Sequence, residues 1–236
     1  MRAYTTDISL AYDRFVAIPL IQPSEEFATS QSDRAYFAIR AMIVRAELAP
    51  GSLLSESDLM STLGLGRTPI REALRTLANE NLVDVYPRRG MFVAGIDTRD
   101  LAALAEVRSN LEAFAARLAA QRSNPQDREA TVRLIDELDA LGNAPDAHAL
   151  LDIDQRMHHH VYRCAHNAYL ERTLDQYFVH ALRIWALALH NVPDLQLAVL
   201  EHRALLSAVR DGNADEAAEL MFKHVDGFET GIRQTL

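Results

Sequence analysis

The sequence predicts a mainly α-helical protein: an N-terminal winged helix-turn-helix followed by an all-α antiparallel bundle of six helices. Three observations predict this fold class. Ala and Leu are abundant, while Gly and Pro number only 9 and 8 in 236 residues, which favours helix. Two segments of alternating apolar and polar residues flank a Pro-Arg-Arg-Gly turn in the first half of the chain. From residue 98 onward, amphipathic helical segments follow one another without any strand pattern.

The distribution of charge divides the chain into two parts. The net charge is −9, but residues 32–94 hold eight Arg against seven acidic residues. Residues 95–236 hold fourteen basic against twenty-two acidic residues. Such asymmetry suggests two domains with different partners. Together with the elements described below, this predicts an N-terminal extension of unassigned role over residues 1–31, a winged helix-turn-helix over 32–95 and a second, helical domain over 98–234.

The sequence shows no sign of export or of membrane insertion. Its single cysteine, Cys164, excludes an internal disulfide and fits a reducing compartment. The apolar segment FVAIPLIQP near the start is short, is interrupted by Pro19 and Pro23, and follows no basic cluster. We therefore expect a cytoplasmic protein without a membrane partner.

The elements of the first domain can be read in order. One helix, in SDRAYFAIRAMIVRAEL, ends before the Pro-Gly of APGS. The next, in SESDLMSTLG, opens with a capping box from Ser55 to Asp58 and ends at Gly64. In TPIREALRTLANEN we expect Thr68 as the N-cap and Pro69 as the first helical residue. LVDVYPRRGMFVAG then predicts a two-stranded wing.

Six amphipathic segments predict the bundle. The turn or helix-stop sequences SNPQD, GNAPD, HN, NVPD and DGN separate them. The expected helices cover residues 98–122, 127–142, 146–166, 167–190, 195–211 and 213–234.

The third helix of the first domain carries arginines that suit DNA binding. Arg71 and Arg75 are four residues apart and share a face, and Arg67 precedes the helix. Arginine pairs bidentately with guanine in the major groove or binds phosphates. The alternative is that these arginines are solvated and pair with neighbours such as Glu72.

A family resemblance favours DNA binding. LLSESDLMSTLGLGRTPIREALRTLANENLVDVYPRRGMFV resembles the winged helix of the GntR family of bacterial transcription regulators. Three positions depart from the family pattern: Gly66 replaces the usual Ser or Thr, Asn81 the usual Gly, and Ser57 an Arg that contacts DNA in some relatives. The residues that we predict to contact DNA are Arg67, Thr68, Arg71, Arg75, Arg88, Arg89 and Gly90.

Four of the nine histidines lie in DIDQRMHHHVYRCAHN, residues 152–167. On a helix, Asp154 and His158 share one face, one turn apart. His159 and His160 are rotated about 100° and about 200° further round, so they do not easily join the same site.

Two further histidines, His202 and His224, stand on separate predicted helices among apolar neighbours at helical spacing and should face inward. Three imidazoles and a carboxylate that converge in a bundle core could bind Zn²⁺, Ni²⁺, Mn²⁺ or Fe²⁺. The alternative is that each is an ordinary histidine whose hydrogen bonds the fold satisfies.

A second resemblance favours the metal site. LAALAEVRSNLEAFAARLAAQRS is similar to the opening helix of the FadR C-terminal (FCD) type of ligand-binding domain, which occurs in one large GntR subfamily. That domain's D-x3-H…H…H pattern implies Asp154, His158, His202 and His224 as ligands, with Zn²⁺ or Ni²⁺ expected ahead of Mn²⁺ or Fe²⁺. Asn167 matches an Asn of the family, thirteen positions after the Asp. The six-helix count resembles the shorter, VanR-like branch.

The resemblance also implies a small-molecule effector. Four protein ligands leave one or two positions open on a five- or six-coordinate ion, which a small carboxylate could fill while it also contacts an Arg. Arg108, which matches an inward-facing Arg of the family, is the first candidate for this effector site, and Arg183 and Asn167 are the others. For Arg108 the alternative is a salt bridge with Glu112.

These residues predict a bacterial transcription regulator, with repression as the commoner habit of the family it resembles. It would bind a pseudo-palindromic double-stranded operator as a homodimer, and a small organic acid bound to the helical domain would alter this operator binding. A metal-dependent hydrolase and a constitutive DNA binder with a structural metal are the alternatives. We do not expect an enzyme, because no general acid or base is evident beside the expected ligands.

Overall fold

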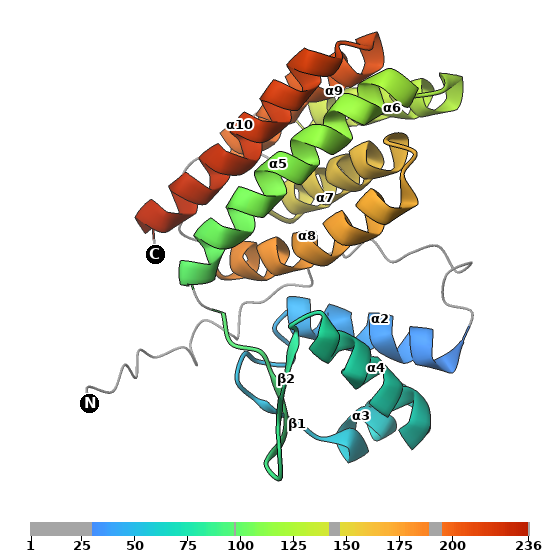
Figure 1. Ribbon diagram of the computed structural model, residues 1–236, viewed down its shortest axis with the longest axis vertical. Coiled ribbons are helices and arrows are strands. Elements are labelled where there is room, and N and C mark those ends of the chain that lie inside the picture. The colour runs from blue at the N-terminus through green and yellow to red at the C-terminus, as the bar shows by residue number, and fades with distance from the viewer. Residues whose placement is uncertain (1–29, 97, 142–146, 189–194, 236) are drawn as a thin grey trace. The chain divides into compact units, whose positions relative to one another are not determined.

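The computed structural model describes residues 30–96, 98–141, 147–188 and 195–235, and it is mainly helical (Figure 1). The chain divides between Gly95 and Ile96 into two compact units, each described by itself below. The predicted fold class is confirmed: a small antiparallel wing follows the helices of the first unit, and the second unit is all helical. Residues 1–29 of the expected extension and the predicted turns GNAPD and NVPD lie outside the described residues.

The first unit has the helix-turn-helix and wing that the sequence predicts, with one strand more. Its elements are α2 (Gln31–Val44), β1 (Leu53–Leu54), α3 (Glu56–Leu63), α4 (Arg67–Asn79), β2 (Val83–Tyr86) and β3 (Gly90–Val93). The antiparallel strand order is β1-β3-β2, with Leu53 opposite Phe92. The prediction of a two-stranded wing missed β1, because a strand of two residues is too short to show an alternating pattern.

The core of this unit holds α4 so that its arginines face outward. The apolar side chains of α2 and α4 that are at most 1% exposed include Ile39, Ile43, Ile70, Leu74 and Leu77. Burial of each stabilises the unit by about 1.5–3 kcal/mol. At the edge of the contact, the Tyr36 hydroxyl donates to the Glu80 carboxylate at 2.8 Å. The polar face of α4 is therefore left to solvent.

The predicted start of α4 was wrong. The helix begins at Arg67 with Gly66 as its N-cap, so Thr68 is the second helical residue and Pro69 the third. Helix α3 ends at Gly64 in the left-handed conformation (φ 65°, ψ 27°), and this short turn allows the next helix to begin earlier. Pro69 fits there because backbone N–H groups of a first turn have no intrahelical acceptor. The preference of Thr for the N-cap is weaker than these constraints.

The second unit contains the six predicted helices. They are α5 (Thr98–Arg122), α6 (Pro125–Ala140), α7 (Ala147–Cys164), α8 (Ala168–Ala188), α9 (Leu195–Asp211) and α10 (Ala214–Thr235). The start of α6 lies two residues before the expected one, because Asn124 caps the helix in a capping box with Asp127. Within the described residues, no helix is long and apolar enough to cross a membrane.

Helix α5 is the central helix of this unit. It packs against α7, α8, α9 and α10, and it runs beside α10 over much of its length (Figure 1). Ala115, Ala116 and Ala119 of α5 and Ala217 of α10 are fully buried, and such small side chains let two helices approach closely. The inner side of α5 is therefore close to residues from several other helices.

Candidate metal centre

Four residues from three helices converge in the second unit. Asp154 and His158 come from α7, His202 from α9 and His224 from α10. One ligand atom of each lies within 4.8 Å of the others, and all four side chains are buried. The structure thus brings together the four residues that the sequence singles out.

The geometry of His158 determines which of its nitrogens faces the cluster. Its Nδ1 lies 2.7 Å from a carboxylate oxygen of Glu112, and we assign this nitrogen as the donor. The lone pair of Nε2 is then directed at the cluster, 3.2 Å from Nε2 of His202 and 3.7 Å from Oδ1 of Asp154. Two imidazole nitrogens at this separation can share a proton or coordinate a common cation.

The surroundings of the Asp154 carboxylate indicate whether a metal ion fits the cluster. Its Oδ1 is buried without a hydrogen bond from any described residue, and Nε2 of His202 lies 3.5 Å away. Burial raises the pKa of Asp154 to about 6, so the group is ionised at neutral pH although its environment opposes the charge. A buried, uncompensated carboxylate is costly unless it coordinates a cation or is paired.

The histidines complete a suitable donor set. Burial lowers the pKa of His224 to about 3, so this imidazole is neutral and its lone pair is available for coordination. Neutral imidazoles and one carboxylate are donors that Zn²⁺, Ni²⁺, Mn²⁺ and Fe²⁺ accept. The residues present therefore fit a divalent transition-metal ion.

A buried ion pair on α5 supports the cluster. Glu112 is fully buried and accepts a hydrogen bond from Nε of Arg108 at 2.6 Å in addition to that from His158. Burial opposes ionisation of Glu112, but the charge of Arg108 and the hydrogen bond from His158 outweigh it and lower its pKa to about 2. A carboxylate that accepts from the far nitrogen of a metal-binding histidine fixes the tautomer and orientation of the ring.

From the sequence, Glu112 is expected only as the salt-bridge partner of Arg108 in the alternative to an effector contact. That salt bridge is present, but the contact of Glu112 with His158 was missed. The available signal was the spacing, because Arg108 and Glu112 occupy the same inward stripe of α5 as Ala105 and Ala119. Charged residues on a buried stripe indicate a partner from another helix.

The predicted effector residues have different surroundings. Arg108 is buried with its guanidinium carbon 5.4 Å from the ring centre of Phe178, and Arg183 is buried on α8. Asn167 instead precedes α8, where its Oδ1 accepts from the backbone N–H groups of Tyr169 and Leu170 at 3.2 Å. Asn167 is thus a helix cap, and its contact with an effector stays a prediction.

His159 and His160 lie outside the cluster, in the directions that helical rotation predicts. His159 pairs with Asp175 at 2.7 Å. His160 lies 2.8 Å from the Thr131 hydroxyl of α6. Burial lowers the pKa of His160 to about 4 and keeps it neutral.

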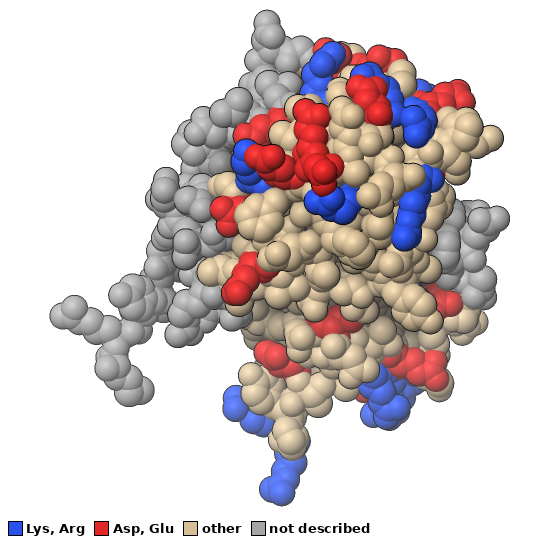
Figure 2. Space-filling model, turned by 45° about the horizontal axis from the view of Figure 1, so that its top comes forward, with Lys and Arg blue, Asp and Glu red and all other residues tan. Residues whose placement is uncertain are grey.

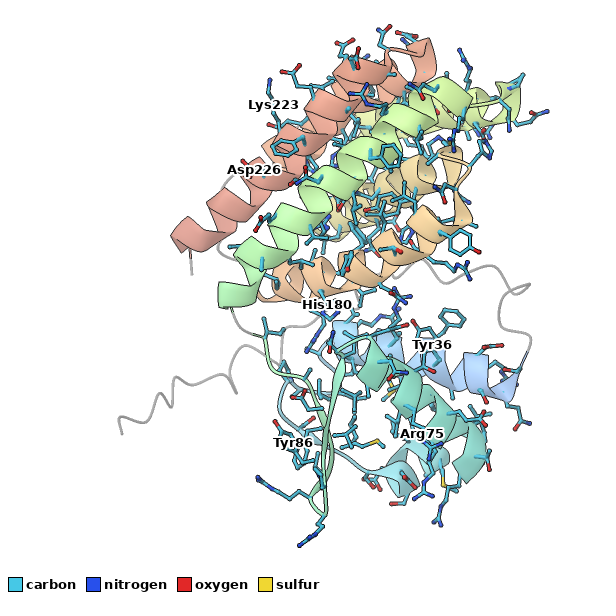
Figure 3. The ribbon with its side chains drawn as sticks, viewed as in Figure 1. Tyr36, Arg75, Tyr86, His180, Lys223 and Asp226 are labelled. Atoms are coloured by element: carbon cyan, nitrogen blue, oxygen red, sulfur yellow. The ribbon has the colours of Figure 1, made fainter. Side chains whose placement is uncertain are left out.

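The arginines of α4 are exposed, and two of them, Arg67 and Arg71, lie beside the carboxylate of Glu56. Arg71 donates from Nε to Glu56 at 2.8 Å, and Nε of Arg67 lies 3.8 Å from the same carboxylate. Glu72, the partner that the alternative interpretation proposed, instead accepts from the hydroxyl of Ser32. Arg75 also lies on α4 (Figure 3).

The tip of the wing is basic and tightly turned. Basic side chains gather at this tip (Figure 2). Arg88 adopts a left-handed conformation (φ 64°), and the guanidinium of Arg89 lies 5.7 Å from the ring centre of Tyr86 on β2 (Figure 3). Gly90 has a φ of 108°, and a Cβ there would lie 3.1 Å from Cδ1 of Leu53. A side chain at this position would strain the turn.

Comparisons with known proteins find a matching family model for each of the two units. The model of the bacterial regulatory proteins of the gntR family matches residues 31–93, and the FCD domain model matches residues 103–227. An HTH-type transcriptional regulator in an unstable DNA locus of Streptomyces ambofaciens is 31% identical over 193 residues, which are 80% of each chain. The galactonate operon transcriptional repressor of Escherichia coli is 29% identical over 219 residues, covering 81% of this chain and 93% of that one.

A solved structure shows the same fold. The E. coli protein McbR/YncC superposes with a TM-score of 0.75 at 20% identity, over 87% of this chain and 98% of that one. The two family models match the DNA-binding and the helical unit separately, and the 31% identical relative spans both. The chain belongs to the GntR family of bacterial transcription regulators, and its second unit is an FCD domain.

Proposed function

We propose that this protein is a repressor that binds a pseudo-palindromic operator as a homodimer and responds to a small organic acid bound at a divalent metal in its FCD domain. The buried cluster of Asp154, His158, His202 and His224, with an unbonded carboxylate oxygen, is the observation that carries the proposal. GntR-family proteins are transcription regulators and not enzymes, so the hydrolase alternative is set aside.

The outer face of α4 would read the major groove. Arg71 and Arg75 are exposed on this face. Arg67 and Thr68 lie in the first turn of the helix, where free backbone N–H groups favour a phosphate. The exposed wing residues Arg88, Arg89 and Gly90 would contact the backbone or the minor groove. Because the proposed partner is chromosomal DNA, we expect the protein in the bacterial cytoplasm.

Exposed apolar side chains on α5 and α10 support a homodimer. Val107 and Phe114 of α5 are 41% and 47% exposed, and Phe222 of α10 is 40% exposed. The two helices pack against each other, so these residues lie on neighbouring elements of one unit. Homodimer interfaces are more apolar than the rest of a protein surface. A two-fold axis would also match the two half-sites of a pseudo-palindromic operator.

A small carboxylate with hydroxyl groups is the effector class that this site would suit. When bound, a divalent cation would supply open coordination positions for carboxylate and hydroxyl oxygens. Arg108 would add a charge-assisted contact, with Arg183 and Asn167 as further candidates. One relative is a repressor of a galactonate operon, and galactonate is a sugar acid, so sugar acids are the first class to test.

The test is thermal unfolding of metal-loaded and chelator-stripped full-length protein against a panel of small carboxylates and sugar acids. An acid that raises the midpoint only when metal is present, and that changes operator affinity, supports the proposal. A metal effect without any acid effect would favour a structural metal in a constitutive DNA binder. If neither metal nor acid changes the midpoint, the metal proposal fails.

A matched pair of variants on α7 makes this test specific. His158→Ala should abolish the metal-dependent rise in the midpoint, because it removes a proposed ligand. His159→Ala removes the next histidine along, which pairs with Asp175 outside the cluster, and should leave that rise unchanged.

A further inference from the structure

Glu56 is an acidic residue among the arginines of the proposed DNA-reading surface. It is the first residue of α3, whereas its partners Arg71 and Arg67 belong to α4. The carboxylate accepts from Nε of Arg71 at 2.8 Å and lies 3.8 Å from Nε of Arg67. Its side chain is 28% exposed, while those of Arg71 and Arg67 are 55% and 68% exposed. The acid is thus less exposed than the two arginines, whose side chains remain accessible to solvent.

The contact restricts Arg71 without occupying all of its donors. Glu56 engages the Nε–H, so the two terminal nitrogens of the guanidinium can still pair with a base edge. A free arginine side chain loses rotamer freedom when it binds a base, and an arginine that is already held loses less. Orientation by Glu56 therefore favours a specific base contact.

The charge of Glu56 acts in the opposite direction on non-specific binding. Binding to DNA of any sequence depends on the neutralisation of phosphates by Lys and Arg. A carboxylate beside Arg71 and Arg67 offsets part of their charge and weakens this term. Specificity is the difference between the affinity for the correct sequence and the affinity for other sequences. Glu56 would increase this difference, because it favours the first and weakens the second.

We propose that Glu56 is a specificity-determining positioning residue: it orients Arg71 toward a base edge and weakens binding to DNA of the wrong sequence. The inference rests on the proposed placement of α4 in the major groove. The test uses full-length protein and two duplexes of equal length. One is recovered from a randomised library by selection with the wild-type protein, and the other is its scrambled counterpart.

Glu56→Gln should tighten binding to the scrambled duplex and reduce the ratio of selected to scrambled affinity roughly tenfold. Asp58→Asn removes the same charge from the same helix, but Asp58 contacts Ser57 and not an arginine in the described contacts. The control should leave the ratio unchanged. If Asp58→Asn lowers the ratio as much as Glu56→Gln does, the effect is one of general charge and the inference fails.

Glu56→Asp separates charge from position. It keeps the negative charge but shortens the side chain by one methylene, so the carboxylate no longer reaches Arg71 with the same geometry. Binding to the scrambled duplex should stay at the wild-type level, while binding to the selected duplex weakens several-fold. Unchanged binding to the selected duplex would overturn the positioning role. Circular dichroism melts of each variant establish that the unit is folded.

A double-mutant cycle with Arg71→Ala tests whether Glu56 acts through Arg71. In the Arg71→Ala background, Glu56→Gln should change the affinity ratio much less than in the wild type, through its charge beside Arg67 alone. A full additional effect would contradict the proposal. If Arg71→Ala lowers the ratio and Glu56→Gln does not, the inference alone fails. If Arg71→Ala leaves both affinities unchanged, the proposed reading of DNA by α4 fails as well.

Discussion

Glu112 accepts hydrogen bonds from a permanently charged side chain, Arg108, and from the proposed metal ligand His158. All three side chains are buried, so none of them can exchange its partner for bulk water. Removal of one member of a buried ion pair leaves the other charge uncompensated, which costs more than the pair itself contributes. At the scale of single residues, the cluster therefore depends on a residue that is not one of its proposed ligands.

Glu112→Gln should destabilise the second unit by about 3 kcal/mol and weaken metal binding by roughly 10–100-fold. The substitution retains the shape of the side chain but leaves Arg108 without its counter-charge. Denaturant unfolding and a metal titration measure the two effects. Arg108→Met combined with Glu112→Gln should recover part of the lost stability. Wild-type stability of the single variant would contradict the proposed role of Glu112.

The stabilisation that a bound metal would provide should depend on pH, in part through Asp154. Its pKa is about 6 in the folded, metal-free protein and 3.8 in its ordinary state, so ionisation destabilises the metal-free fold as pH rises from about 4 to about 6. Metal binding requires the ionised form. The metal-dependent rise in melting temperature should be full above pH 7 and disappear as pH falls toward 4. A constant rise from pH 4 to 8 would exclude Asp154 as a ligand.

At the scale of elements, the start of α4 illustrates how a turn can override a local preference. Gly66 is an N-cap without a side-chain hydrogen bond, although the family pattern has Ser or Thr at this position. Its extended backbone (φ −72°, ψ 169°) suits any residue, and a Cβ would meet only Cδ of Pro69, at 3.9 Å. Gly64, two residues earlier, has a φ of 65°, which disfavours a side chain. The two glycines therefore have different structural roles.

Gly66→Ser should stabilise the first unit by a few tenths of a kcal/mol, because a hydroxyl can cap the free N–H groups of α4. The same hydroxyl lies beside Arg67 and should tighten DNA binding by a phosphate contact. Gly64→Ser, the matched control, should destabilise the unit by about 1 kcal/mol. Thermal unfolding of both variants measures these changes. Stabilisation by Gly64→Ser would contradict the assigned roles.

At the scale of the whole molecule, the protein is a transcription regulator of two domains, a DNA-binding domain and an FCD domain. If the operator is pseudo-palindromic, two copies of the protein must bind it together, one on each half-site. The exposed apolar residues of α5 and α10 belong to the second unit, whereas the exposed arginines of α4 belong to the first, so the two proposed surfaces share no residue.

Phe114→Glu should convert the proposed dimer to a monomer, because it places a charge in the proposed apolar interface. Sedimentation velocity would report the change in mass, and operator affinity should fall at least tenfold because the two half-sites are no longer bound together. Tyr169→Ser on α8 removes a side chain that is 80% exposed and should leave both properties unchanged. A wild-type sedimentation coefficient for Phe114→Glu would place the interface elsewhere.

The sequence by itself determined the helices of this protein, but not strand β1 or the first residue of α4. The 3.6-residue period, the caps and the turns located all six helices of the second unit, because these signals come from neighbouring residues. The same period put Asp154 and His158 on one face of α7 and turned His159 away. It could not bring His202 and His224 to them, and the resemblance to the FCD family suggested that step.

Only the tertiary structure decided the partners of the charged residues. His158 and Glu112 are 46 positions apart, and Arg71 and Glu56 are 15 apart on different helices. Nothing in a local pattern selects such pairs, since they depend on the packing of α5 against α7 and of α3 against α4. The sequence predicted which side chains face inward or outward, and the packing of the helices determined which of them meet.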